Sequence, residues 1–308
     1  MVPHVPVLKD EVLQFLAIRA DGLYVDGTFG RGGHTRAILA QLGPAGRLLA
    51  LDRDPDAVAV GRQLHEADSR FEIVQSPFSA LGEVLRNHGV AGRVQGILLD
   101  VGVSSPQLED PARGFGFRVD GPLDMRMDPG SGQSAADWLN AADEAGIAQV
   151  LWRFGEERAS RKIARAVVHA RTAAPISTTS QLAAIIERVV HREPGRHPAT
   201  RSFQAIRIHI NRELDELEAG LRGGLDCLAV GGRLCVISFH SLEDRIVKRF
   251  LRDHARVDPA LRSLPVVPES AQPDLALLTT RAVRASEAEV LQNPRARSAV
   301  LRAAEKRR

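Results

Sequence analysis

The sequence VDGTFGRGGHT, residues 25–35, places four glycines within eleven positions, directly after the apolar run Leu23–Val25. Such a run is typical of a buried β-strand, and residues 35–42 after the glycines have the apolar spacing of a helix. Glycine is costly to order and adopts conformations that other residues avoid. A glycine cluster between a strand and a helix therefore predicts a sharp turn or a backbone that passes close to a ligand.

The same alternation of strand and helix continues to about residue 105. We predict strands at 23–25, 47–52, 71–74 and 96–100, and helices at 10–18, 35–42, 55–65 and 80–87. Strict alternation predicts a parallel sheet covered by helices on both faces. A strand at 231–239 resumes the pattern, with two further candidates at 275–280 and 297–303.

A different pattern occupies the middle of the chain. Residues 106–133 are rich in glycine, proline and acids, while 135–170 and 180–191 have helical periodicity. The polar loop HREPGRHPATR follows, and then one long helix is expected at 203–221. We therefore predict a discontinuous core, residues 1–108 and 202–308, interrupted by a helical insertion of residues 109–201.

Composition places the chain among ordinary globular proteins, with 308 residues, 44% hydrophobic and 26% charged. We see no leader pattern and no apolar run of membrane-spanning length, so a cytoplasmic location without a membrane partner is expected. Cysteines 227 and 235 and the ten histidines show no metal-ligand spacing, so neither a disulfide nor a metal is expected. The net charge is +3, and arginine supplies all but four of the 41 basic residues, which is compatible with a phosphate-binding patch.

The glycine turn does not have the G-x-G-x-x-G spacing of a dinucleotide site. From Asp26 it reads D-x-T-x-G-x-G-G, which resembles the acid-x-G-x-G-x-G loop of S-adenosylmethionine methyltransferases, with Thr28 in the place of the first glycine. Gly30, Gly32 and Gly33 would then let the backbone approach a cofactor without a pyrophosphate. A plain tight turn is the structural alternative.

Two further positions extend this interpretation. Asp52 ends the second predicted strand about twenty residues after the glycines, where a carboxylate can accept hydrogen bonds from both hydroxyls of a ribose. Phe78 follows the third strand, where it could flank an adenine, although an aromatic residue at this point is as often ordinary core.

Asp100 ends the fourth predicted strand, and Ser104-Ser105-Pro106-Gln107 follow it. This tetrapeptide resembles, at a distance, the Asp/Asn/Ser-Pro-Pro-aromatic motif of amine methyltransferases. In that motif the polar side chain accepts a hydrogen bond from the target amine, which frees the nitrogen lone pair for in-line attack and acts chiefly by positioning. We therefore assign Asp100, Ser104 and Ser105 to catalysis, while a capped turn would explain Ser and Pro equally well.

Longer runs carry a more specific resemblance. YVDGTFGRGGHT, GILLDVGVSSPQLED, HPATRSFQAIRIHIN and GGRLCVISFHSLEDRIVKRF, with others covering nearly the whole chain, resemble the bacterial 16S ribosomal RNA cytosine-N4 methyltransferase H family. The resemblance implies an α/β fold: a Rossmann-like methyltransferase core with a mostly parallel twisted sheet and an inserted helical domain. It also implies S-adenosylmethionine as methyl donor and a cytidine of the small-subunit decoding region as substrate. The cofactor ligands it implies are Gly32, Gly33, His34, Asp52, Phe78, Asp100 and Gln107.

Arginines of the insertion are the predicted RNA contacts, namely Arg161, Arg165, Arg196 and Arg201. A solvated helix face is the alternative for the first two. His240, which follows the strand at 231–239, either points into the active crevice or caps the next helix.

Other functions stay open at this point. An amine methyltransferase could act on DNA, another RNA or a small molecule, and a cofactor-binding RNA chaperone could keep the fold without the chemistry. The substrate implied by the resemblance is 16S ribosomal RNA within the small subunit, and a homodimer is left open.

Overall fold

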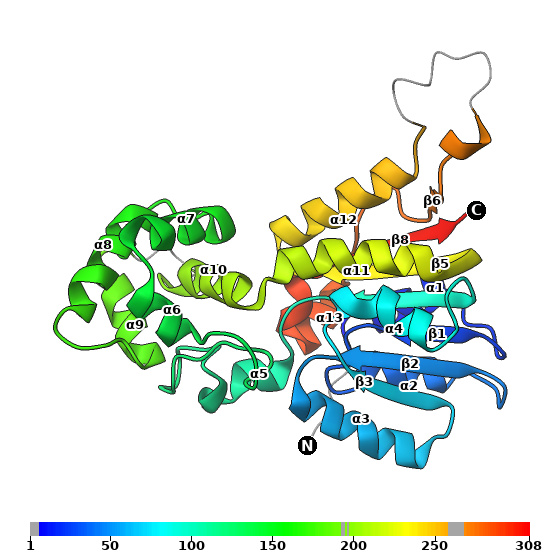
Figure 1. Ribbon diagram of the computed structural model, residues 1–308, viewed down its shortest axis with the longest axis horizontal. Coiled ribbons are helices and arrows are strands. Elements are labelled where there is room, and N and C mark those ends of the chain that lie inside the picture. Colours follow the sequence, from blue (N-terminus) through cyan, green and yellow to red (C-terminus); the bar gives the residue numbers. More distant parts are fainter. Residues whose placement is uncertain (1–5, 192–194, 196, 258–267) are drawn as a thin grey trace. The chain divides into compact units, whose positions relative to one another are not determined.

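Figure 1 shows the computed structural model of the chain, which describes residues 6–191, 195, 197–257 and 268–308. The chain forms two compact units, one of Met1–Gly102 with Leu214–Arg308 and one of Val103–Glu213. The predicted insertion, residues 109–201, lies inside the second unit. None of the helices in the described part of the chain combines the length and apolar character that a membrane span requires.

The first unit is built on a single twisted sheet. Among the described residues this sheet has eight strands, in the order β3-β2-β1-β4-β5-β8-β6, with β7 paired to β8. Pairing is parallel from β3 through β5, whereas β8 runs antiparallel to β5, β6 and β7. The strands are β1 (Leu23–Asp26), β2 (Arg47–Asp52), β3 (Phe71–Gln75), β4 (Val94–Asp100), β5 (Leu228–Ser238), β6 (Leu275–Leu277), β7 (Val283–Arg284) and β8 (Val300–Lys306).

Helices cover both faces of this sheet. One face packs on α1 (Lys9–Leu16), α2 (Gly33–Leu39), α3 (Pro55–Ala67) and α13 (Glu287–Gln292), and the other packs on α4 (Leu81–Asn87), α11 (Glu213–Cys227) and α12 (Ser241–His254). Successive strand residues alternate between the two cores: Leu98 faces the first core, while Ile97 and Leu99 face the second. The predicted α/β class with a mostly parallel sheet is thus confirmed.

The second unit is helical. It contains α5 (Ser105–Glu109), α6 (Ala135–Ala141), α7 (Glu144–Gly155), α8 (Ser160–Arg171), α9 (Thr179–Glu187) and α10 (Thr200–Asn211). Residues 114–133 between α5 and α6 carry no helix or strand, as their glycines and prolines predicted. Buried side chains such as Ile147, Ile163, Ile186 and Phe203 give this unit a core of its own.

The predicted single helix at 203–221 is wrong, because the chain breaks between α10 and α11. Arg212 adopts a left-handed conformation with φ of 52°. Asn211 stabilises the break: its side chain donates to the Met125 carbonyl at 2.7 Å and accepts the Met127 N–H at 2.8 Å. These partners lie far away in sequence, so helical periodicity alone could not reveal the break.

Candidate active site

The strand order reverses beside β1, since β2 and β3 continue the sheet on one side and β4 and β5 on the other. Ligands of open α/β sheets bind at the carboxyl ends of the strands at such a switch point. Three carboxylates lie at this edge because Asp26, Asp52 and Asp100 are the last residues of β1, β2 and β4. The structure therefore brings the predicted Asp52 and Asp100 to the same edge as the glycine turn.

The turn after β1 is tied by backbone hydrogen bonds to the strands on both sides. Gly27 donates to the Leu98 carbonyl and Phe29 donates to the Leu51 carbonyl. Gly30 and Gly32 have φ values of 56° and 73°, a backbone region that residues other than glycine rarely adopt. The glycine cluster that the sequence predicted is thus a rigid turn, in which side chains at Gly27 and Gly32 would collide with the neighbouring side chains of Leu99 and Phe29.

Asp26, at the end of β1, anchors this turn through hydrogen bonds. Its carboxylate is fully buried and accepts hydrogen bonds from the Thr35 hydroxyl at 2.7 Å and from the Thr28 N–H at 3.1 Å. The Thr28 hydroxyl in turn accepts the N–H of Asp100 at 2.7 Å. Sequence reasoning missed this role of Thr28, although a hydroxyl residue in the place of a glycine was a visible signal.

Asp52 is held by the turn itself. One carboxylate oxygen accepts the Gly30 N–H at 2.7 Å and the other accepts the Asp54 N–H at 2.9 Å. Burial raises the pKa of Asp52 to about 6, and these two hydrogen bonds limit the rise. A carboxylate has about four acceptor positions, so two remain for the ribose hydroxyls of the predicted cofactor.

Asp100 and His34 form the least satisfied polar pair of the edge. The Nε2 atom of His34 lies 3.7 Å from Oδ2 of Asp100, and Oδ1 of Asp100 has no hydrogen-bond partner among the described residues. The buried ring of His34 interacts with the backbone of Val7, but neither ring nitrogen makes a hydrogen bond of standard length and angle within the described part of the chain. Burial lowers the pKa of His34 to about 4, so its ring is neutral at pH 7. Burial and the nearby negative charges of Asp26 and Glu243 raise the pKa of Asp100 to about 8. Buried polar atoms without partners are costly, which indicates that a ligand completes this pair.

Phe78 lies in a short 3₁₀ helix (Phe78–Ala80) after β3, half-buried, and a side chain at Gly220 would collide with its ring. It therefore packs on α11 with one side, as an ordinary core residue would, and its contact with an adenine stays a prediction. In the helical unit, the side chain of Gln107 is buried and accepts the Ser104 N–H at 2.9 Å at the start of α5. This is the capped turn that was the alternative interpretation of this segment, and the cofactor contact of Gln107 and the amine-holding role of Ser104 and Ser105 stay predictions.

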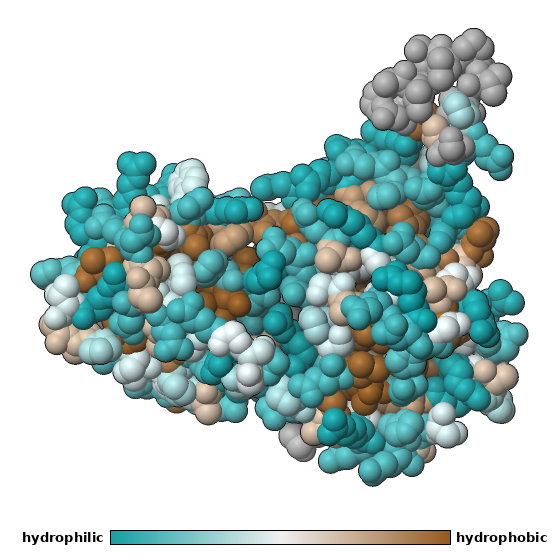
Figure 2. All heavy atoms as spheres, in the orientation of Figure 1, coloured by the Kyte–Doolittle hydropathy of each residue, from teal (hydrophilic) through white to brown (hydrophobic). Residues whose placement is uncertain are grey.

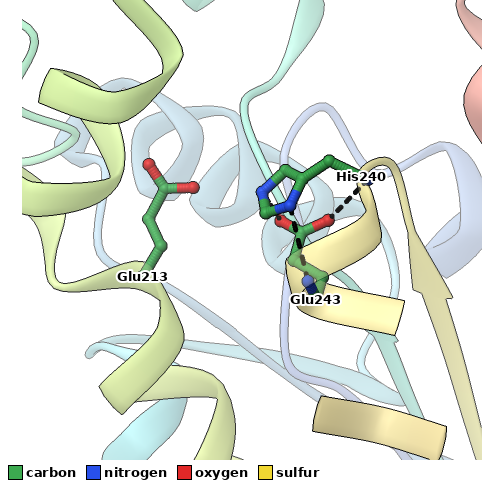
Figure 3. Close-up of side chains that lie close together, drawn as sticks. All are labelled: Glu213, His240 and Glu243. Atoms are coloured by element: carbon green, nitrogen blue, oxygen red, sulfur yellow. Dashed lines mark hydrogen bonds and ion pairs between the residues drawn. The ribbon is translucent and has the colours of Figure 1, made fainter. Parts of the chain in front are cut away.

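Figure 3 shows that His240 and Glu243 cap the start of α12. Glu243 accepts the backbone N–H groups of Phe239 and His240 at 2.8 and 3.2 Å, and the His240 ring lies 3.0 Å from the same carboxylate. Figure 3 also draws Glu213, whose two oxygens each accept a 2.8 Å hydrogen bond from Arg207. Of the two interpretations of His240, the helix cap is therefore the one that its contacts support.

The helical unit has a groove of about 1240 Å³, lined by residues of α7 and α8 and of the segments around α9 and α10. Trp152 lines it with 61% of its surface exposed, an aromatic that sequence reasoning did not select. The predicted Arg161 and Arg201 also line the groove, together with Arg158 and Lys162.

The other two predicted RNA contacts differ from these. Arg165 is 80% exposed on α8, lies 3.7 Å from Glu144 and is not part of the groove. Arg196 lies outside the described residues.

The residues of the sheet edge suit S-adenosylmethionine. A turn with glycines at 27, 30, 32 and 33 would bring the backbone close to its methionine and ribose, Asp52 has acceptor positions left for the hydroxyls, and Oδ1 of Asp100 is available to a polar group. Asp100 in its ionised form matches the positive charge of this cofactor.

The family profile of the MraW methylase family matches residues 1–307. The chain is 60% identical over 304 residues to Ribosomal RNA small subunit methyltransferase H of Thiobacillus denitrificans, covering 98% of this chain and 97% of that protein. It is 55% identical over 307 residues to the protein of the same name from Coxiella burnetii, covering 99% of each. Among solved structures, an rRNA methylase from Streptococcus thermophilus aligns with a TM-score of 0.39 and 13% identity over 96% of this chain and 93% of that one. The chain belongs to the MraW methylase family, which confirms the predicted methyltransferase class and S-adenosylmethionine as its methyl donor.

Proposed function

We propose that this protein methylates the exocyclic N4 amine of a cytidine in the decoding region of 16S ribosomal RNA, within the small ribosomal subunit. The observation that carries the proposal is the pairing of the buried His34 ring with Asp100, whose buried Oδ1 has no partner among the described residues, at the switch point of a chain 55–60% identical to proteins named as small-subunit RNA methyltransferases. Their names support ribosomal RNA as the substrate, and the resemblance of the motifs supports the cytidine amine.

When bound, S-adenosylmethionine supplies a methyl group on a positively charged sulfonium. Asp52 would hold the ribose, since its carboxylate is oriented by the N–H groups of Gly30 and Asp54 and cannot rotate freely. Asp100 and His34 would bind the polar part of the cofactor, with the neutral imidazole donating from one ring nitrogen. Because these groups are fixed before the ligand arrives, little ordering remains to be done on binding.

An amine conjugated to a pyrimidine ring is planar and a weak nucleophile. Acceptors for both of its hydrogens leave the nitrogen lone pair free to attack, which is an effect of orientation. We assign this task to Asp100 and to the Ser104-Ser105 segment that follows β4. Once the methyl group is transferred, the nitrogen carries an extra proton, which can pass to water without a dedicated base.

Recognition of the RNA is assigned to the groove of the helical unit. An exposed indole such as that of Trp152 can stack on an unpaired base, and cations such as Arg161 and Arg201 can bind the adjoining phosphates. Stacking favours single-stranded RNA, whose bases are already accessible. This arrangement supports RNA rather than a free small molecule as the substrate.

The proposal is tested by offering the purified enzyme three substrates in parallel: small subunits from a strain that lacks its gene, the naked RNA of those subunits, and DNA. Tritium transfer from labelled S-adenosylmethionine measures the rate, and nucleoside chromatography identifies the product. We expect N4-methylcytidine from the ribosomal substrates and none from DNA. A methylated base other than cytidine, or preference for DNA, would contradict the proposal.

A further inference from the structure

The exposed side of α12 carries a row of basic side chains in the first unit. The row consists of four exposed residues: Arg245, Lys248, Arg249 and Arg252. The last three follow Arg245 by three, four and seven positions, which places all four on one side of the helix. We call these four residues the α12 basic face. They belong to the core and are separate from the arginines of the helical unit considered above.

Packing fixes the direction in which this face points. Val247 and Leu251 on the opposite side are buried in the core of the sheet, and Ile246 and Phe250 pack beside them. The helix cannot turn without exposing these apolar side chains, so the four cations stay in solvent. Figure 2, drawn in the orientation of Figure 1, shows hydrophilic residues along α12.

Two of the three acids of the same helix are engaged elsewhere and do not offset the charge of this face. Glu243 is buried in the cap of the helix. Asp244 accepts two hydrogen bonds from Arg302 on β8, at 2.6 and 3.1 Å, and so forms a bidentate ion pair with it. Asp253 remains exposed and pairs with its neighbour Arg252 at 2.9 Å.

On the neighbouring helix α11, Glu218 lies 3.0 Å from Arg249, and Arg245 also has an interaction partner. Lys248, by contrast, forms no ion pair with any residue that the structure describes. Arg249 and Arg252 thus each face an acid, and Lys248 is a cation of this face whose charge no described acid offsets.

Topology places the start of this face at the ligand edge of the sheet. Helix α12 begins directly after β5, and Ile237 of β5 is in register with Asp100 of β4. The face then extends for about 10 Å along the helix, from the rise of 1.5 Å per residue between Arg245 and Arg252. An extended polyanion that reaches the sheet edge at Asp100 could therefore continue along α12.

We propose that the α12 basic face binds the phosphate backbone of the ribosomal RNA substrate and holds the strand at the carboxyl edge of the sheet. The inference rests on the proposed function, because it takes its polyanion from there. Phosphate is the fitting group, because the exposed side chains of this face are cations and none of the exposed large hydrophobic side chains among the described residues lies on α12. Contacts of this kind position the RNA without reading its sequence.

The test compares the wild type with the double variant Lys248→Gln/Arg252→Gln, which leaves the Arg249–Glu218 pair in place. A matched control, Arg62→Gln/Arg93→Gln, removes two exposed cations from α3 and from the loop before β4 in the same unit. Binding to small subunits from a gene-deletion strain is measured between 50 and 200 mM salt. Unchanged affinity for S-adenosylmethionine verifies that each variant is folded.

We expect the α12 variant to bind at least tenfold more weakly at 50 mM salt. Loss of two phosphate contacts should reduce the slope of log K against log salt by about 1.5, so the deficit should shrink about eightfold by 200 mM. The control should bind as the wild type does. Wild-type affinity and slope in the α12 variant, or an equal loss in the control, would overturn the inference while leaving the proposed function intact. A wild-type enzyme that neither binds nor methylates small subunits would overturn both.

Discussion

Replacing Asp100 by asparagine should remove a pH dependence from cofactor binding. Burial and the charges of Asp26 and Glu243 raise the pKa of Asp100 from its usual 3.8 to about 8. At pH 7 only about 10% of unliganded molecules then carry the ionised side chain. A positively charged cofactor binds the ionised form, so its binding should expel a proton from Asp100, and Asp100→Asn has no such proton to lose.

The size of the effect follows from the ionised fraction, because apparent affinity scales with the population of the binding-competent form. With a pKa of about 8 this fraction rises from about 0.03 at pH 6.5 to about 0.76 at pH 8.5, so affinity should rise about 25-fold. Asp52, whose pKa is about 6, adds less than about twofold over the same range. Titration of the cofactor's own amino group affects both proteins equally and cancels in the ratio of their affinities.

Isothermal titration calorimetry from pH 6.5 to 8.5 provides the assay, with two buffers of different ionisation enthalpy at each pH to count the protons released. The ratio of wild-type to Asp100→Asn affinity should grow about 25-fold across the range. Turnover of the variant should fall further than its cofactor affinity at pH 7 if Asp100 also holds the amine. A ratio that stays constant within twofold would refute the reasoning, since Asp100 would then be ionised already or would not meet the cofactor.

Asp52→Ala should weaken S-adenosylmethionine binding by about 1.5–3 kcal/mol, the range for hydrogen bonds to a charged group, and unchanged affinity in calorimetry would remove Asp52 from the cofactor site. Thr28→Val should destabilise the protein by about 1–3 kcal/mol in urea unfolding, because the Asp100 N–H loses its acceptor, whereas Thr28→Ser should stay near wild type. Ser105→Ala should lower turnover more than cofactor affinity, and equal losses would make this segment a wall of the cofactor site. Trp152→Ala and Arg161→Glu should each weaken binding to small subunits about tenfold, as expected for about 1–3 kcal/mol of stacking or a lost phosphate contact, with cofactor affinity as the control.

Local sequence signals were sufficient for much of the core. The predicted strand at 47–52 coincides with β2, because an apolar run bounded by turn residues has few other structures available. Asp52 and Asp100 could be located because parallel strands all end at the same edge of a sheet. The glycine turn was predicted from the conformations that Gly30 and Gly32 indeed adopt.

Other features depend on partners that lie far away in sequence. The break at Arg212 relies on Asn211 reaching the segment around Met125, which helical periodicity cannot report. The antiparallel insertion of β8 between β5 and β6 is likewise set by distant pairing. In the sequence, Trp152 resembles any other apolar residue of a helix, and only the tertiary packing shows that it lies exposed at the groove.

The central claim is that this chain methylates the N4 amine of a decoding-region cytidine, and mass mapping of 16S ribosomal RNA tests it most directly. Small subunits are purified from a gene-deletion strain carrying either the wild-type gene or Asp100→Ala, and nuclease fragments of their RNA are compared by mass spectrometry. We predict one decoding-region fragment that is heavier by a methyl group with the wild-type gene, contains N4-methylcytidine and is unmodified with Asp100→Ala. A fragment whose mass is the same with both genes, or a methyl group that appears on another base, would contradict the account.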